Sequence, residues 1–212
     1  MRCLHIRTFT LILGGLLAVP AAAAGQACVG SPAAAGGTAL SGSIGFPDGA
    51  KSYGAEVRYN TMGPLSVGAG YRLTSPDVGD VNMHSFAVDA AYELPLTGAS
   101  VCPVAGLGYG RMSESGTTLS TLTVPVGAGI GYSLQAGPNM TVIPHAIPQL
   151  LWMRTTFDSD AAPDAVSDSQ TEFGALLGVT FQMQRFFLNG GVTKTTVEDS
   201  KAVFSLGAGV VF

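Results

Sequence analysis

The sequence has little charge: of its 212 residues, 10 are Lys or Arg and 14 are Asp or Glu, which is 11% in all. An ordinary soluble domain carries about 25%. The formal net charge is −4 and no basic patch is present, which excludes general nucleic-acid binding. So little charge also excludes a disordered chain, the hydrophobic share of 47% is ordinary, and the length suits one domain.

Long hydrophobic runs are also scarce, and the one near the N-terminus has the pattern of a secretory signal peptide. Arg2 and Arg7 precede an apolar run at residues 9–19, and small residues follow up to Ala24. We expect a signal peptide at residues 1–24, with cleavage as late as Ala27 as the alternative. An uncleaved anchor helix is disfavoured because the run is short of the roughly 20 residues that span a bilayer.

Beyond this segment the chain lacks any apolar stretch of 18 residues, although its mean hydropathy is +0.37. Glycine is abundant instead, with 29 residues, about twice its usual share. A secreted chain with positive hydropathy, few charges and no spanning helix is typical of a closed transmembrane β-barrel.

Apolar residues alternate with Gly, Ala, Ser and charged residues along most of the chain, as expected of barrel strands. The alternation predicts an all-β, closed antiparallel barrel over residues 38–212, after an N-terminal periplasmic segment at 25–37. Eight strands are the alternative if the short first or ninth run does not span. The ten expected strands cover residues 40–46, 53–59, 65–73, 86–94, 101–111, 122–134, 142–152, 173–183, 186–192 and 204–212.

The connections between these runs alternate in length, which sets the orientation. The longest one, residues 155–170, falls on the side expected to be extracellular, whereas the short turns fall on the periplasmic side. Both termini are therefore expected in the periplasm. The aromatic residues fall on the apolar phase near strand ends, in two predicted girdles. The outer girdle comprises Tyr53, Tyr71, Tyr109, Trp152, Phe173 and Phe204, and the periplasmic girdle Tyr59, Tyr92, Tyr132, Phe181, Phe186 and Phe212.

The end of the chain resembles the terminal signal of outer-membrane β-barrel proteins. Phe212 is the last residue, and Phe204, Leu206, Ala208 and Val210 precede it at steps of two. From about residue 38 onward the architecture is similar to the OmpX/OmpW-like group of small outer-membrane barrels. The resemblance implies residence in the outer membrane of a Gram-negative-type envelope and recognition by the barrel-assembly machinery, but no particular activity.

Charged side chains within the strands fall on the phase opposite to the lipid-facing one, since a charge at the lipid midplane costs roughly 2–4 kcal/mol for Arg or Lys. A rough register places Arg72 near Glu56, with Asp89 one strand over. The cluster either forms a paired network that fills the lumen or lines an ion-conducting one. The predicted lumen-facing polar residues are Glu56, Arg58, Arg72, Asp89, Glu93, His145, Glu172 and Gln182.

Of three cysteines, Cys3 leaves with the signal peptide, so the mature chain keeps Cys28 and Cys102. The periplasm is oxidising, and both positions fall at the periplasmic end, which predicts a disulfide. The bond would pin residues 29–37 across the periplasmic mouth. Two free thiols, or lipidation of Cys28, are the alternatives.

Catalysis is not expected, because no Ser–His pair shares a face; a site combining His84 with Asp77, Asp80 or Asp158 is the weak alternative. The acidic loop, residues 158–168, does not have EF-hand spacing, so we expect no metal site beyond weak divalent-cation binding, and no cofactor. Three functions are open: a structural or surface-interaction barrel, a narrow passive pore, and a barrel enzyme. The expected partners are outer-membrane lipid and lipopolysaccharide, with the protein a monomer.

Overall fold

A computed structural model describes residues 26–77, 81–96, 99–114, 116–159, 165–196 and 200–212. The predicted signal peptide at 1–24 lies outside these ranges, as do Asp80, Asp160 and Asp164. Among the described residues, no helix is both long and apolar enough to cross a membrane. The strands are β1 (Thr38–Phe46), β2 (Ala50–Asn60), β3 (Leu65–Pro76), β4 (Met83–Tyr92), β5 (Leu94–Leu96), β6 (Ala99–Glu114), β7 (Thr117–Gly131), β8 (Leu134–Gly137), β9 (Met140–Ser159), β10 (Val166–Met183), β11 (Phe186–Thr195) and β12 (Val203–Val211).

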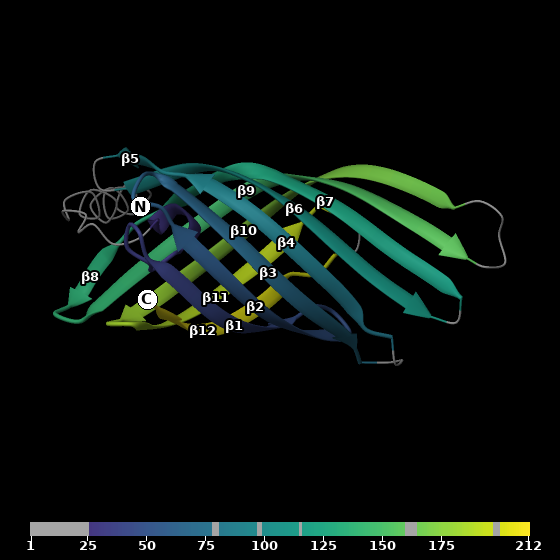
Figure 1. Ribbon diagram of the computed structural model, residues 1–212, viewed down its shortest axis with the longest axis horizontal. Coiled ribbons are helices and arrows are strands. Elements are labelled where there is room, and N and C mark those ends of the chain that lie inside the picture. Colours follow the sequence, from purple (N-terminus) through teal and green to yellow (C-terminus); the bar gives the residue numbers. More distant parts are fainter. Residues whose placement is uncertain (1–25, 78–80, 97–98, 115, 160–164, 197–199) are drawn as a thin grey trace, which may run out of the picture.

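These strands form one antiparallel sheet that closes on itself, because β1 pairs with both β2 and β12 (Figure 1). The short β5 continues β4, since both pair with β6 in one unbroken register. In the same way β8 continues β7 along β9. With β4–β5 and β7–β8 each counted as one strand, the barrel wall has ten strands. This confirms the predicted closed ten-stranded barrel, and the eight-stranded alternative is wrong.

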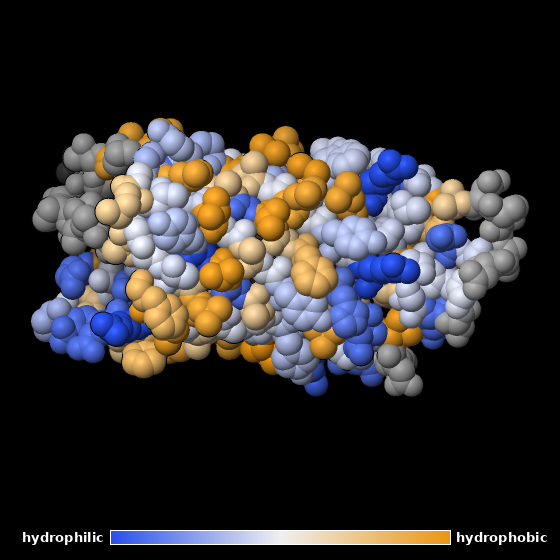
Figure 2. All heavy atoms as spheres, in the orientation of Figure 1, coloured by the Kyte–Doolittle hydropathy of each residue, from blue (hydrophilic) through white to orange (hydrophobic). Residues whose placement is uncertain are grey.

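The period-two alternation of the sequence becomes an inner and an outer face. Outward side chains at mid-height are aliphatic and exposed, with Val57 42%, Leu107 47% and Val126 54% accessible. Figure 2 shows apolar side chains gathered over the middle of the face in view, with the most polar ones toward its two ends. Closure leaves every interior strand paired on both sides, which is the condition for a sheet to stand in lipid.

The wall of the barrel is uneven in height. Strands β6, β7, β9 and β10 have 16, 15, 20 and 18 residues, whereas β1 and β12 have 9 each. The β9–β10 ladder continues to the Phe157–Val166 pair, although β11 joins β10 only from Gly174 onward. The four long strands therefore project past the rest at one end, called here the long-strand end (Figure 1).

The opposite end, called here the plug end, receives both the start of β1 and the C-terminus. The Thr38 amide donates to the Phe212 carbonyl at 3.2 Å, and the Phe212 amide donates back to Thr38 at 2.8 Å. The chain therefore enters the barrel wall beside the place where it ends. Residues 26–37, the described residues that precede Thr38, consequently lie at the plug end.

Candidate functional site: the plugged lumen

Residues 26–37, called here the plug segment, fold into the barrel at the plug end. Their first turn is a short 3-10 helix, Ala27–Val29. Gln26, Ala27, Cys28 and Ser31 are each less than 5% exposed. A segment of small residues thus occupies the mouth of the lumen rather than hanging outside it.

A disulfide between Cys28 and Cys102 ties this segment to β6, as the sequence predicts, with the two Cα atoms 5.8 Å apart. Neither cysteine is exposed, and Ala91 of β4 packs against them. The bond closes a sequence separation of 74 residues. In the chain-entropy model a crosslink of this length contributes roughly 4 kcal/mol.

Two glycines of β7 make room for the plug segment. A Cβ atom on Gly131 would overlap the carbonyl oxygen of Ala27, and one on Gly129 would overlap that of Cys28. Both obstacles are backbone atoms, which cannot rotate away as a flexible side chain can. The absence of side chains at these two positions therefore lets the 3-10 turn lie directly on the barrel wall.

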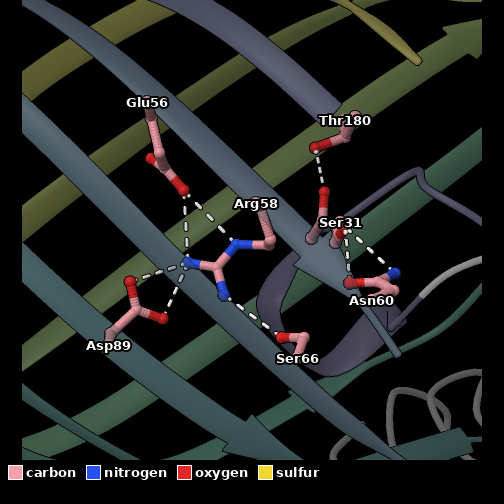
Figure 3. Close-up of polar contacts among 8 residues, drawn as sticks. Ser31, Glu56, Arg58, Asn60, Ser66, Asp89 and Thr180 are labelled. Carbon is pink, nitrogen blue, oxygen red and sulfur yellow. Dashed lines mark hydrogen bonds and ion pairs between the residues drawn. The ribbon is translucent and has the colours of Figure 1, made fainter. Parts of the chain in front are cut away.

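Hydrogen bonds attach the plug segment to other parts of the wall. The Gln26 side-chain amide donates to the Pro64 carbonyl at 2.5 Å, in the turn after β2, and the Thr180 hydroxyl of β10 donates to the Gly30 carbonyl at 2.9 Å. Asn60 of β2 donates its side-chain amide to the Ala33 carbonyl, and its own backbone amide to the Gly37 carbonyl at 3.0 Å. Figure 3 shows the Thr180 and Asn60 side chains on either side of the segment. With the disulfide on β6, these contacts span the mouth.

Above the plug segment lies a lumen cavity of about 570 Å³, with residues 29–32 among its lining. Its two sides differ in chemistry. Ser41, Ser43, Glu56, Arg72 and Asp89 line it from β1 to β4, whereas Pro125, Ile147, Leu151 and Leu176 line it from β7 to β10. The carboxylates and guanidinium groups that line the cavity therefore all lie on β2 to β4, whereas the β7 to β10 side mixes these apolar residues with Thr123, His145, Gln149 and Thr180.

Arg58 organises the charged side of the cavity. Its Nη2 atom donates to both carboxylate oxygens of Asp89, at 2.8 and 2.9 Å, and to Glu56 at 3.2 Å. Its Nη1 atom donates to Ser66, which is fully buried, at 3.2 Å. Figure 3 shows the guanidinium lying between the two carboxylates. The arrangement stabilises two acids that face the lumen from different strands.

The register explains why Arg58 reaches two strands away. Arg58, Gly68 and Asp89 stand in one cross-strand row, and a Cβ on Gly68 would meet both the guanidinium and the Asp89 carboxylate. The ladder agrees with the rough register from the sequence, which places Arg72 near Glu56: Arg72 stands opposite Gly54, diagonally beside Glu56. Arg72 lines the cavity and forms no hydrogen bond or ion pair with the described residues.

The other predicted lumen residues are spread along the barrel. His145 lines the cavity beside Gly30 of the plug segment, and its Nδ1 atom lies 3.3 Å from the Ile143 carbonyl. Glu93 lies between β4 and β5, half-buried at the plug end, while Gln182 donates to the Gln184 carbonyl. Glu172 lies toward the long-strand end, where its carboxylate accepts from the Thr196 hydroxyl at 2.6 Å. The structure therefore groups Glu56, Arg58, Arg72, Asp89 and His145 around one cavity and leaves Glu93, Glu172 and Gln182 apart.

The structure describes only part of the two alternative sites of the sequence analysis, the one around His84 and the acidic loop. The Nδ1 atom of His84 lies 2.7 Å from the Tyr71 hydroxyl, on the outer face of the barrel. Asp160 and Asp164 of the acidic loop lie outside the described residues. Among the residues that are described, no three His, Cys, Asp or Glu side chains are grouped closely enough to hold a metal ion.

Several residues that hold the plug segment carry no advance signal in the sequence. Asn60 and Thr180 are ordinary polar residues on the inward phase, and nothing near them marks a partner more than 25 residues away. The glycines on the inward phase of β7 are visible in the sequence. Their role depends on the route of the plug segment, which alternation cannot supply because the segment is not a strand.

Comparison with known proteins identifies the fold. No family model and no curated protein matches the chain. Among solved structures, the translocator domain of the autotransporter NalP from Neisseria meningitidis has a TM-score of 0.53 at 10% identity, covering 83% of this chain and 87% of that one. The β domain of the Bordetella autotransporter BrkA has a TM-score of 0.51 at 10% identity, covering 82% and 97%. The Yersinia pestis attachment invasion locus protein Ail has a TM-score of 0.41 at 17% identity, covering 84% and 99%. The two autotransporter barrels, with TM-scores above 0.5, show that the chain has the fold of outer-membrane β-barrels, and the resemblance to the OmpX/OmpW-like group stays a prediction.

Proposed function

We propose that this protein is an integral outer-membrane barrel with a structural or surface-interaction role, and that its lumen is closed at the periplasmic mouth. The observation that carries the proposal is the plug segment. It is bound covalently to β6 and by hydrogen bonds to Thr180, Asn60 and the turn at Pro64. A pore would need this mouth to be open, whereas a membrane-anchored platform for surface contacts does not.

The proposal predicts that the oxidised protein carries no steady current in a planar lipid bilayer. A variant that lacks residues 26–36 and has Cys102→Ser should show a steady ohmic conductance, because the truncation removes the floor of the cavity. The truncated chain still contains every barrel strand from Thr38 to Val211. A steady current through the intact, oxidised protein would contradict the closed-lumen proposal.

A narrow passive pore is the second candidate, and the cavity itself favours it. The lumen holds about 570 Å³ of space, and the side chain of Glu56 is 49% exposed within it. Such a channel would conduct only after the plug segment leaves the mouth. If the intact protein conducts, ions or small solutes passing the Arg58 group would be the first transport substrates to examine.

The orientation we propose places the long-strand end outside the cell and both chain termini in the periplasm. The chain has three lysines, and all of them lie at the long-strand end of the barrel and are exposed: Lys51, Lys194 and Lys201. A membrane-impermeant amine reagent applied to intact cells should therefore label these lysines and not the N-terminal amine. Permeabilised cells provide the control, because the N-terminal amine should then react as well. Lysines that react only after permeabilisation would reverse the orientation.

The remaining expectations from the sequence are also proposals. Strand β12 presents Phe204 and Leu206 outward, and Phe212 follows it, with 61%, 60% and 75% of each residue exposed, which suits recognition by the barrel-assembly machinery. We further propose a non-enzymatic monomer that needs no cofactor and contacts outer-membrane lipid, lipopolysaccharide included.

A further inference from the structure

Cations at the long-strand end are placed on the outer face of the barrel. Within the described ranges, five residues that can carry positive charge face outward there, and all five are exposed. They are Lys51 of β2, His84 of β4, Arg111 of β6, Arg154 of β9 and Lys194 of β11. Arg58 and Arg72 face the lumen instead, and Arg185 lies in the turn at the plug end.

Most of these cations lie two residues from an aromatic residue on the same strand and the same face, on the side away from the middle of the barrel. Lys51 lies two residues from Tyr53, Arg111 two from Tyr109, and Arg154 two from Trp152. Two residues along a strand correspond to roughly 7 Å. The aromatic rings mark the level at which a bilayer meets water. The cations therefore stand one step farther out, at the level of lipid headgroups.

The acidic residues at this end lie either on the inward face or farther from the middle of the barrel than the cations. Asp168 and Glu172 of β10, and Glu114 of β6, lie on the inward phase of their strands. Asp158 faces outward, but its row, shared with Thr118, lies beyond the cations. The exposed Asp77 also lies beyond them, two residues past Ser75, the partner of Lys51. Asp48 forms an ion pair with Lys201 at 2.9 Å. The described headgroup-level band of the outer face thus carries positive charge without a carboxylate among the cations.

The densest part of this band lies on β4 to β10. One cross-strand row contains, in order, His84, Arg111, Ser120, Thr156 and Ser167. Arg154 lies in the adjacent row toward the middle of the barrel, next to Leu122. Arg111 and Arg154 therefore flank β7, with hydroxyl groups beside them. Neither arginine forms an ion pair with the described residues, although Arg154 donates to Ser167 at 3.5 Å.

Guanidinium groups that have no ion pair and stand beside hydroxyls can bind an anionic ligand. Arginine presents a planar fork of donors that matches phosphate oxygens, and the contact is stronger than a neutral hydrogen bond. The stems of long cationic side chains can lie along the apolar wall while the charged heads stay at the interface. We propose that the outer face around Arg111 and Arg154 binds the phosphate groups of an anionic glycolipid in the adjoining leaflet, and we call this face the phosphate-lipid site.

This inference rests on the membrane orientation proposed above, but not on the closed lumen. Its test uses native mass spectrometry of the oxidised protein in neutral detergent. The probes are lipid A with both phosphates, the same lipid after enzymatic dephosphorylation, and phosphatidylcholine. We expect the phosphorylated lipid to be retained at least about tenfold more strongly than the other two, since charge-assisted contacts supply the difference.

Single substitutions locate the phosphate-lipid site. Arg111→Gln and Arg154→Gln should each weaken retention of the phosphorylated lipid about three- to tenfold. The double variant should retain the phosphorylated lipid no more strongly than the dephosphorylated lipid. Arg185→Gln is the matched control, because it removes the same charge at the plug end and should change retention less than about twofold. Two measurements would show that each variant is folded: a disulfide content equal to that of the wild type, and the same change in SDS-gel mobility between unboiled and boiled samples.

Three results would overturn the proposal. If Arg185→Gln weakened lipid retention as much as Arg111→Gln or Arg154→Gln, net charge alone would control binding. Equal retention of the phosphorylated and dephosphorylated lipids would show that contacts with the apolar wall control binding. Binding of a soluble sulfated polysaccharide that is lost in the double variant, with lipid retention unchanged, would assign the site to a soluble polyanion. The amine-labelling experiment tests the orientation separately, so a failed orientation would move the phosphate-lipid site to the other leaflet without removing it.

Discussion

Gly131→Ala should release the plug segment and leave Cys28 and Cys102 largely as free thiols. The added methyl group would overlap the Ala27 carbonyl oxygen, and the backbone on both sides of that contact is fixed. The 3-10 turn must therefore move away from β7, which carries Cys28 away from Cys102. Loss of the crosslink removes roughly 4 kcal/mol of stabilisation in the chain-entropy model, and the floor of the cavity leaves with it.

Two measurements check this result. Thiol titration of the non-reduced variant should show close to two reactive cysteines per chain, and planar-bilayer recording should show a steady current that the wild type lacks. Gly108→Ala on β6 is the matched control, because the nearest atoms to its Cβ lie at an ordinary 3.8 Å and include no plug residue. A fully oxidised Gly131→Ala protein with no current would show that the plug segment does not depend on this contact.

The alternation of apolar and small or polar residues is enough to predict most of the barrel, because each strand keeps a period of two over its whole length. Outward residues such as Val57 and Leu107 and inward ones such as Glu56 follow from a strict period of two, and a slip by one residue would invert a strand. Closure follows as well, since an even set of amphipathic strands leaves no edge in lipid. The Cys28–Cys102 bond could be predicted because both cysteines map to one end of the barrel.

The interior of the mouth could not be predicted in the same way. The plug segment has no periodicity, so its contacts with Asn60, Thr180 and Gly131 depend on a path that only the folded chain defines. The ion pairs of the lumen could not be predicted for a related reason. The sequence sets which residues face inward, but the choice between Arg58 and Arg72 as the partner of Asp89 depends on the exact stagger of β2, β3 and β4.

That choice gives the second large prediction: Arg58→Met should destabilise the barrel, whereas Arg72→Met should not. Methionine keeps much of the length of the Arg58 side chain but leaves the Glu56 and Asp89 carboxylates without their shared cation. Removing one partner of a fully buried pair costs about 3–5 kcal/mol. Here the two acids are 49% and 37% exposed to the lumen, so solvent screening reduces the expected loss to about 1–3 kcal/mol.

The free energy of unfolding, from urea titrations of the oxidised protein in detergent, tests this difference. Arg72→Met is the matched control: it removes the same charge from the adjacent strand, and Arg72 forms no ion pair within the described residues. Adding Asp89→Asn to Arg58→Met should recover part of the loss, because it removes one of the two uncompensated carboxylates. Equal destabilisation by Arg58→Met and Arg72→Met, or no recovery in the double variant, would mean that the Arg58 group does not hold β2 and β4 together across Gly68.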